Sequence, residues 1–119
     1  MKTSSAKAKG RTLQQWTRDK ILQEFNLEPD DCRSVSMGMQ GEDLLFSPGA
    51  GRLLRISVEC KSRERVALYA WYEQAKQNSP NNREPVVVFK QNRSRPLVAL
   101  DAEQFFRILK QARSWDGQG

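Results

Sequence analysis

The sequence contains no histidine and only two cysteines, Cys32 and Cys60, among its 119 residues. The absence of histidine removes the usual general base, the commonest zinc ligand, and the Ser/His/Asp and Cys/His nucleophile arrangements. Two cysteines are too few for the disulfide framework of a small secreted scaffold. Catalysis by this chain must therefore use carboxylates, lysine, a thiol, or a metal ion bound through oxygen.

Long apolar segments are also missing from the sequence. No apolar run approaches the ~20 residues that a membrane-spanning helix needs, and residues 1–11 lack the hydrophobic segment of a signal peptide. We therefore expect a protein without a membrane segment that works in a reducing cytoplasm.

The charge of the chain is unbalanced. Its 20 Lys and Arg against 14 Asp and Glu give a formal net charge of +6, with a pI near 9.7. An excess of positive charge on a small domain favours an acidic polymer such as nucleic acid as the partner. A single domain of this length gains limited stability from burial alone, which favours association with another subunit.

The order of predicted elements indicates a single α/β domain with a central mixed β-sheet flanked by helices. Residues 1–11 are basic without any acid and predict a flexible basic arm, which leaves residues 12–119 for the folded domain. Capping residues, apolar periodicity and turn residues then predict the elements of this domain. In chain order they are a helix at 12–26, strands at 32–37 and 43–46, a turn at 47–51, a strand at 53–62, a helix at 66–78, strands at 86–89 and 96–100, and a helix after Asp101 whose Phe105, Ile108, Leu109 and Ala112 face the core.

Three charged residues occupy positions that a folded domain has reason to avoid. Asp43 opens an apolar strand after a glycine-bearing loop, and Glu59 and Lys61 share one face of the next strand. A short hairpin or bulged turn between these strands would bring Asp43 near Glu59. Paired carboxylates favour a hard divalent cation such as Mg²⁺ or Mn²⁺. Lys61 can then hold or deprotonate a water, or neutralise charge developing on a phosphate.

The alternative interpretation is that Glu59 and Lys61 belong to the solvated face of a half-exposed strand and that Asp43 is only a turn residue. Helices predicted on both sides of the sheet favour the functional interpretation, because they would cover both faces of an interior strand. The charged side chains of Glu59 and Lys61 on such a strand would then have to lie in a cleft that admits water or a ligand.

Basic residues cluster at strand ends, in one hairpin and in the N-terminal arm. Their clustering favours a surface that follows the phosphates of a nucleic acid, and the alternative is ordinary solvated charge. Ser36 can donate a hydrogen bond to a phosphate or simply end a strand. The complete set is Lys9, Arg11, Arg33, Ser36, Arg63, Arg65, Lys90, Arg93 and Arg95.

Asp43, followed by Glu59-Cys60-Lys61 on the next strand, resembles the D…(D/E)-x-K signature of the PD-(D/E)XK nuclease superfamily, whose restriction-endonuclease-like core has a similar order of elements. The resemblance is closest to archaeal-type and bacteriophage Holliday-junction resolvases. It covers nearly the whole chain through Lys9-Gly10-Arg11, Ser36-Met37-Gly38, Gly41-Glu42-Asp43-Leu44, Ser57-Val58-Glu59-Cys60-Lys61, Glu73-Gln74-Ala75, Val87-Val88-Phe89-Lys90 and Asn92-Arg93.

This resemblance implies metal-dependent hydrolysis of phosphodiester bonds in DNA four-way junctions, with Mg²⁺ as cofactor and Mn²⁺ as a substitute. Asp43 and Glu59 would be metal ligands, the backbone carbonyl of Cys60 would complete the coordination, and Lys61 would position the attacking water. Archaeal-type members carry a glutamate where this chain has Gln14, and a neutral amide is a poorer cation ligand, which leaves a second metal open. Gln15 is the rival for that position. The Cys60 thiol is expected to point into the core.

The resemblance and the small size together imply a homodimer, because a two-fold symmetric junction suits a two-fold symmetric protein. Phe106 and Trp115 lie off or beyond the apolar stripe of the last helix and are the residues expected at the interface. The resemblance also implies a bacterial, archaeal or phage-infected cytoplasm. The alternatives are a nuclease of the same fold acting on nicked, flapped or duplex DNA, and a non-catalytic DNA-binding module.

Overall fold

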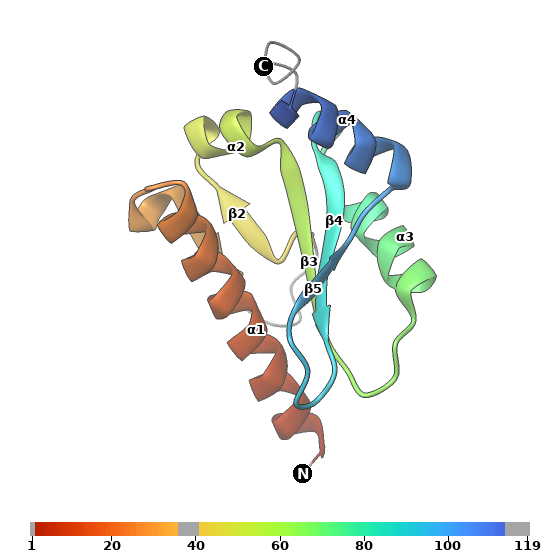
Figure 1. Ribbon diagram of the computed structural model, residues 1–119. Coiled ribbons are helices and arrows are strands. Elements are labelled where there is room, and N and C mark those ends of the chain that lie inside the picture. Colours follow the sequence, from red (N-terminus) through yellow and green to blue (C-terminus); the bar gives the residue numbers. More distant parts are fainter. Residues whose placement is uncertain (1, 36–40, 114–119) are drawn as a thin grey trace.

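The longest element is the helix α1 (Lys2–Glu24), which runs diagonally along one side of the molecule (Figure 1). The computed structural model describes residues 2–35 and 41–113. The predicted helix start at Thr12 is wrong, because residues 2–11, expected as a flexible arm, form the first turns of α1. Thr12 Oγ1 donates to the Ala8 carbonyl at 2.9 Å, a bond of the helix interior rather than of a cap. The alanines and lysines of this segment favour helix but carry no apolar periodicity.

The remaining elements follow the predicted order with two additions, η1 and α2. They are η1 (Pro29–Asp31), β1 (Cys32–Ser34), β2 (Leu44–Phe46), α2 (Pro48–Leu54), β3 (Ile56–Ser62), α3 (Leu68–Asn78), β4 (Glu84–Lys90), β5 (Leu97–Ala99) and α4 (Ala102–Arg113). The helix α2 occupies residues expected as a simple turn at 47–51, and it also shows that the predicted strand start at residue 53 is wrong, because β3 begins at Ile56. Ser47 caps this helix by accepting the Ala50 N–H at 3.1 Å, and Pro48 occupies its first position.

The strands confirm an α/β domain with a mixed sheet. In the three-stranded sheet β3 is parallel to β4, which is antiparallel to β5, and α3 forms the crossover between the parallel strands. The strands β1 and β2 form a separate antiparallel pair. The Asp43 N–H donates to the Val58 carbonyl at 3.1 Å and thereby connects the start of β2 to the middle of β3.

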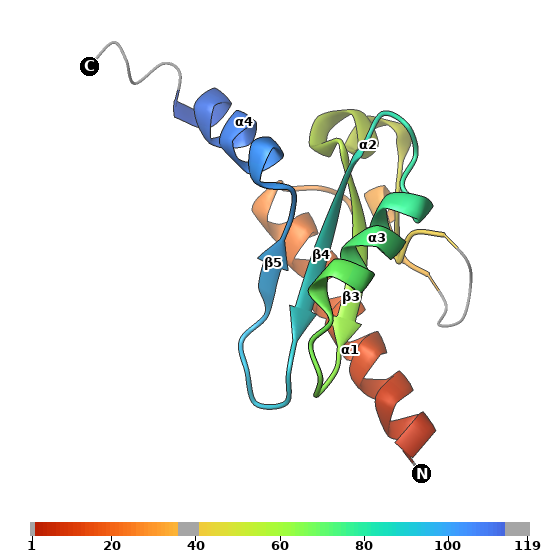
Figure 2. The same ribbon diagram turned by 90° about the vertical axis from the view of Figure 1, so that its right-hand side faces the viewer.

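Helices cover the two faces of the sheet. Figure 2 shows α3 in front of β3 and β4 and α1 behind them. On the α1 side, Leu13 packs with Val58 and Cys60, and on the α3 side Trp71 packs with Val87. Because Glu59 pairs with Val87 in the parallel register, the Glu59 side chain lies on the α3 side.

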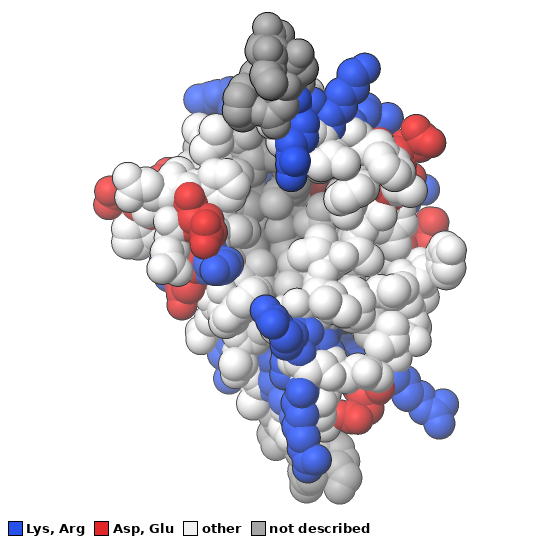
Figure 3. All heavy atoms as spheres, in the orientation of Figure 1, with Lys and Arg blue, Asp and Glu red and all other residues white. Residues whose placement is uncertain are grey.

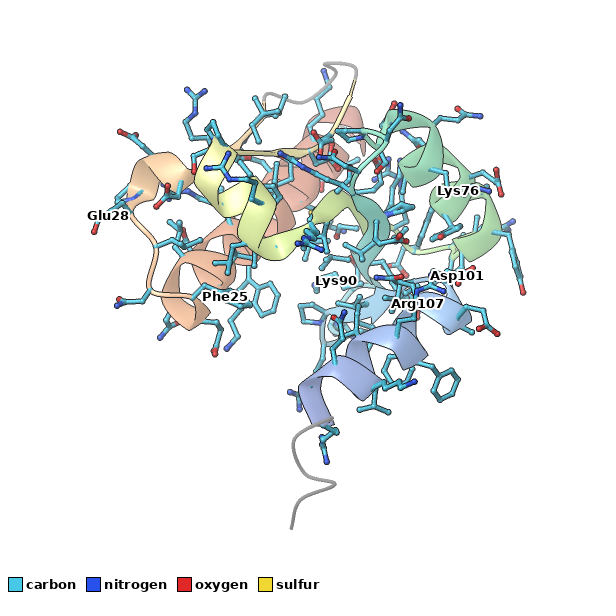
Figure 4. The ribbon with its side chains drawn as sticks, turned by 90° about the horizontal axis from the view of Figure 1, so that it is seen from above. Phe25, Glu28, Lys76, Lys90, Asp101 and Arg107 are labelled. Carbon is cyan, nitrogen blue, oxygen red and sulfur yellow. The ribbon has the colours of Figure 1, made fainter. Side chains whose placement is uncertain are left out.

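The helix α4 follows the edge strand β5. The Asp101 carboxylate accepts the Gln104 N–H at 3.0 Å, which confirms the predicted cap at the start of this helix. The prediction that its apolar stripe faces the core is wrong, since none of residues 102–113, all of which the structure describes, is buried. Seen from above in Figure 4, α4, which carries Arg107, projects from the body of the domain.

Candidate active site

Asp43 contacts β3 through both its backbone and its side chain. Besides the bond from its N–H to Val58, its Oδ2 accepts the backbone N–H of Cys60 at 2.7 Å. The chain reaches this position through α2, so the predicted hairpin or bulged turn is wrong. The expected approach of Asp43 to the strand that carries Glu59 is nevertheless observed.

Glu59 and Lys61 form an ion pair at the covered face of β3. Lys61 Nζ lies 3.4 Å from Glu59 Oε2, and the Asn78 side chain at the end of α3 also donates a hydrogen bond to Glu59. Glu59 is only 4% exposed. The alternative in which these residues form a solvated strand face is therefore wrong.

The two carboxylates are electrostatically coupled. Burial raises the pKa of Glu59 above its ordinary value, and the nearby negative charge of Asp43 raises it further. Burial also raises the pKa of Asp43, while the Cys60 amide and the Lys61 charge oppose that rise. The buried Glu59 and the half-buried Asp43 repel each other, so a cation placed between the two carboxylates stabilises both.

Gln14 is the neighbour of Asp43 from α1. It is 3% exposed, its Oε1 accepts the Ser34 hydroxyl at 2.8 Å, and its side chain donates a hydrogen bond to Asp43. Gln15 instead lies on the exposed side of α1. Of the two candidate glutamines, Gln14 is therefore the one that contacts the carboxylate site.

The Cys60 thiol points to the α1 side, as expected for a small core residue. Its Sγ lies 3.8 Å from Thr17 Oγ1, and burial raises the pKa of the thiol to about 12. The N–H and C=O of a strand residue point to the same neighbouring strand. Since the Cys60 N–H binds Asp43, its carbonyl faces the Asp43 side as well.

The donor set at this site consists of two carboxylates and one backbone carbonyl. Among residues 2–35 and 41–113, no group of three or more His, Cys, Asp or Glu side chains is placed to hold a metal ion. Mg²⁺ nevertheless commonly binds through one or two carboxylates and keeps several waters, whereas structural Zn²⁺ needs four Cys or His ligands. The chemistry of the donors from Asp43, Glu59 and Cys60 fits Mg²⁺.

A basic surface lies beside the end of β3, between the N-terminal half of α1 and the β4–β5 hairpin. We define it by Lys9, Arg63, Lys90 and Arg93, which line two cavities of about 450 and 280 Å³. Lys9 Nζ donates to Asn92 Oδ1 at 2.8 Å and joins α1 to the hairpin. Figure 3 shows Lys and Arg gathered over this part of the molecule. Ser62, directly after Lys61, lines both cavities, but its side chain points to the α1 side of the sheet, whereas Glu59 and Lys61 point to the α3 side.

The other predicted DNA-contacting residues are distributed more widely. Arg11, Arg65 and Arg95 are exposed and line neither of the two cavities. Arg33 lies on β1 in a separate depression that it shares with Arg18 and Gln15 of α1. Ser36 lies outside the described residues. Four of the nine expected contacts, Lys9, Arg63, Lys90 and Arg93, are thus brought together, and of these Arg63 is close enough to Asp43 for its charge to oppose the rise of the Asp43 pKa.

Sequence reasoning missed a buried ion pair next to Asp43. Arg83 Nη1 lies 3.5 Å from Glu42 Oε2, and the guanidinium stacks over the Phe46 ring at 5.6 Å from its centroid. A Cβ at Gly51 would lie 2.9 Å from Arg83 Cζ, so glycine makes room for the guanidinium. Nothing in the sequence links two residues that lie so far apart in the chain. Asn78 and Ser34 were missed for the same reason.

Comparisons with models of protein families, with curated proteins and with solved structures find no match to this chain. Within the described residues, no helix has the length and apolar character needed to cross a membrane. What the protein does must therefore be inferred from its own residues.

Proposed function

We propose that this protein is a Mg²⁺-dependent endonuclease with a restriction-endonuclease-like core that hydrolyses phosphodiester bonds in branched DNA, with the four-way junction as its preferred substrate. The observation that carries the proposal is the electrostatically coupled pair of carboxylates, the half-buried Asp43 and the buried Glu59, held at β3 with Lys61 3.4 Å from Glu59. A lysine beside two acidic metal ligands provides the groups that phosphodiester hydrolysis needs, so no histidine is required.

Each residue of the site has a distinct task. Asp43 and Glu59 hold Mg²⁺, or Mn²⁺ in its place, together with the carbonyl of Cys60. The bound cation supplies Lewis acidity and lowers the pKa of water. The Cys60 amide and Gln14 fix the orientation of the Asp43 carboxylate. Lys61 orients the attacking water and places a positive charge near the phosphate as negative charge develops on it.

The basic surface supports a polyanionic substrate. Lys9, Arg63, Lys90 and Arg93 line the two cavities at the end of β3 and offer positive charge to the phosphates of a bound strand. The preference for a branched substrate follows from the resemblance described above and from the homodimer that it implies. We propose the cytoplasm as the site of action.

The test is a paired cleavage assay. A synthetic four-way junction and a linear duplex of the same arm sequence are incubated with the protein in Mg²⁺, in Mn²⁺ and in EDTA. We expect junction nicking in either metal and none in EDTA. Asp43→Asn and Glu59→Gln should abolish nicking while junction binding, measured by mobility shift in EDTA, persists. Glu73→Gln, which removes a surface carboxylate paired with Lys76 on α3, is the matched control and should remain active.

Each other outcome identifies a rival function. Equal nicking of duplex and junction would show that the protein has no preference for junctions and is a nuclease of the same fold that acts on duplex DNA. Metal-independent binding with no cleavage of nicked, flapped or four-way DNA would indicate a non-catalytic DNA-binding module. Full activity of Asp43→Asn would remove the site assignment itself.

A further inference from the structure

The larger of the two cavities in the basic surface contains an exposed tryptophan. Trp16 of α1 is 46% exposed and lines this cavity of about 450 Å³ together with Lys9, Lys90 and Arg93. In the part of the chain that the structure describes, no aromatic ring and no cationic group pairs with its indole. An indole left in water forgoes the free energy that stacking and burial provide. The ring is therefore available to a ligand that also carries negative charge.

The helix α1 presents the basic and the aromatic group to the same cavity. Lys9 and Trp16 are seven residues apart, which is roughly two helical turns and about 10 Å along the axis. Thr12 lies between them and lines the cavity as well. The 2.8 Å hydrogen bond from Lys9 Nζ to Asn92 holds the ammonium group at the β4–β5 hairpin. Positive charge and aromatic surface are thus separated by about the length of a few stacked nucleotides.

The two ends of the cavity differ in polarity. At one end, Lys9 and Asn92 also line the smaller basic cavity of about 280 Å³. At the other end, Trp16 and Pro96 also line an apolar hollow of about 350 Å³ over the sheet. Figure 3 shows uncharged atoms in this hollow, with Lys and Arg gathered beyond its rim. A nucleotide has the same polarity, because it joins an anionic phosphate to a flat ring that stacks on aromatic side chains.

The cavity lies on the opposite side of the sheet from the carboxylates. Ser62 lines it from the α1 side, whereas Glu59 and Lys61 point to the α3 side. Arg63, at the end of β3, lines the smaller cavity and lies close enough to Asp43 for its charge to act on that carboxylate. A strand that contacts both places must turn around the end of β3. Duplex DNA, with a persistence length of about 150 base pairs, is too stiff for so sharp a turn, whereas an unpaired strand is not.

We propose that this cavity binds an unpaired nucleotide of the DNA substrate, with its base stacked on Trp16 and the phosphates of the same strand on Lys9, Lys90 and Arg93. The inference rests on DNA as the ligand proposed above, but not on its cleavage. An unpaired base offers a free face for stacking, whereas a paired base is already stacked on its neighbours. The substrate is then DNA with an unpaired segment next to the cut, as at a branch point or a flap.

The test compares two single strands of equal length and charge. One is a fluorescein-labelled thymidine oligonucleotide, and the other carries abasic sites in place of the bases. Each is titrated with the full chain in EDTA and followed by anisotropy. We expect the wild type to bind the thymidine strand about 10-fold or more tightly than the abasic strand. Trp16→Leu should remove this preference, and Trp16→Phe should retain most of it.

The matched control is Phe106→Leu. Phe106 is a 60% exposed aromatic residue of α4 that lines neither basic cavity. Its replacement should leave the preference for the thymidine strand unchanged. Circular dichroism checks that each variant is folded.

Tryptophan fluorescence reports the stacking directly. The thymidine strand should quench the emission of the wild type, and Trp16→Leu should lose this quenching. Trp71 is only 8% exposed and is shielded from a bound strand. Trp115 lies outside the described residues, so the measurement is repeated in a Trp115→Phe background. Quenching that persists without Trp16 would contradict the inference.

Two results of the binding assay would overturn the inference. Equal affinity of the wild type for both strands would mean that the cavity binds phosphates alone, and a Trp16→Leu variant that keeps the preference would remove Trp16 from the site. A protein that cleaves DNA but lacks the preference would refute this inference and leave the nuclease proposal intact. Asp43→Asn should keep the preference whether or not the wild type cleaves DNA, so the two proposals can fail separately.

Discussion

The backbone amide of Cys60 donates a 2.7 Å hydrogen bond to the carboxylate of Asp43, so the residue before β2 is oriented by the middle of β3. Apart from proline, no substitution at Cys60 removes this donor, because it is the backbone N–H. The orientation of Asp43 therefore depends on the backbone register between the two segments, and the carboxylate is positioned before any ligand arrives.

Metal-free protein should lose stability as the pH rises. The pKa values of Asp43 and Glu59 are raised by burial above the 3.8 and 4.5 of the free groups. The folded state therefore holds protons that the unfolded chain has released, and the free energy of unfolding falls as pH rises from about 4 through the folded-state values. Glu59→Gln should flatten this decline and raise the melting temperature near neutral pH. Calorimetry in EDTA across this range compares the variant with wild type, and parallel profiles would contradict the expectation.

Gln14→Glu should strengthen metal binding at the expense of stability without metal. The new carboxylate would sit against Asp43 in a buried position and could no longer offer an amide donor to it. We expect a lower melting temperature in EDTA and a larger rise on adding Mn²⁺ than in wild type. Gln15→Glu, on the exposed side of α1, is the control and should change neither value appreciably. A Gln14→Glu variant unaffected by EDTA would place this residue outside the metal environment.

Substitutions in the basic surface should weaken DNA binding and reduce its salt dependence. Each phosphate contact contributes a slope of about 0.9 to the logarithmic dependence of affinity on salt. Lys9→Gln and Lys90→Gln should each lower affinity and flatten that slope, as titrated by fluorescence anisotropy at several NaCl concentrations. Lys76→Gln is the control, because it removes the same charge from α3, away from both cavities, and it should change DNA affinity less than the other two variants. If all three variants behave alike, net charge rather than this surface governs binding.

Arg83→Leu should destabilise the fold near the site by about 3 kcal/mol, because Glu42 would then be left as a buried charge without its partner. The double variant Glu42→Leu/Arg83→Leu should recover part of the loss, since it removes both charges. Urea unfolding measures both values. Equal losses in the single and double variants would mean that Arg83 acts by packing on Phe46 rather than by charge.

Apolar periodicity predicted the elements whose apolar side chains pack against other elements of the same chain. The alternation in β3, the stripe of α3 and the apolar run of β4 each correspond to contacts between neighbouring elements. The carboxylate pair was also found from the sequence, because charged residues in apolar strands are costly unless they have a task.

The rest of the fold and site depended on information that local patterns do not contain. The start of α1 has helix propensity without apolar residues, and α2 contains two glycines that indicate a turn. Apolar spacing in α4 correctly indicated an amphipathic helix but could not say what covers it. The Arg83 and Glu42 pair and the Asn78 contact to Glu59 arise only when segments distant in the chain come together.

The two native cysteines, which are too few for a disulfide framework, make the protein convenient for site-specific labelling. Both thiols are buried, and burial raises the pKa of Cys32 to about 11 and that of Cys60 to about 12, so little reactive thiolate exists in the folded state. One cysteine placed at the exposed Lys110 of α4 would be the dominant reactive thiol. A spin label attached there would report the separation of two copies, or their movement on DNA, without removing either native cysteine.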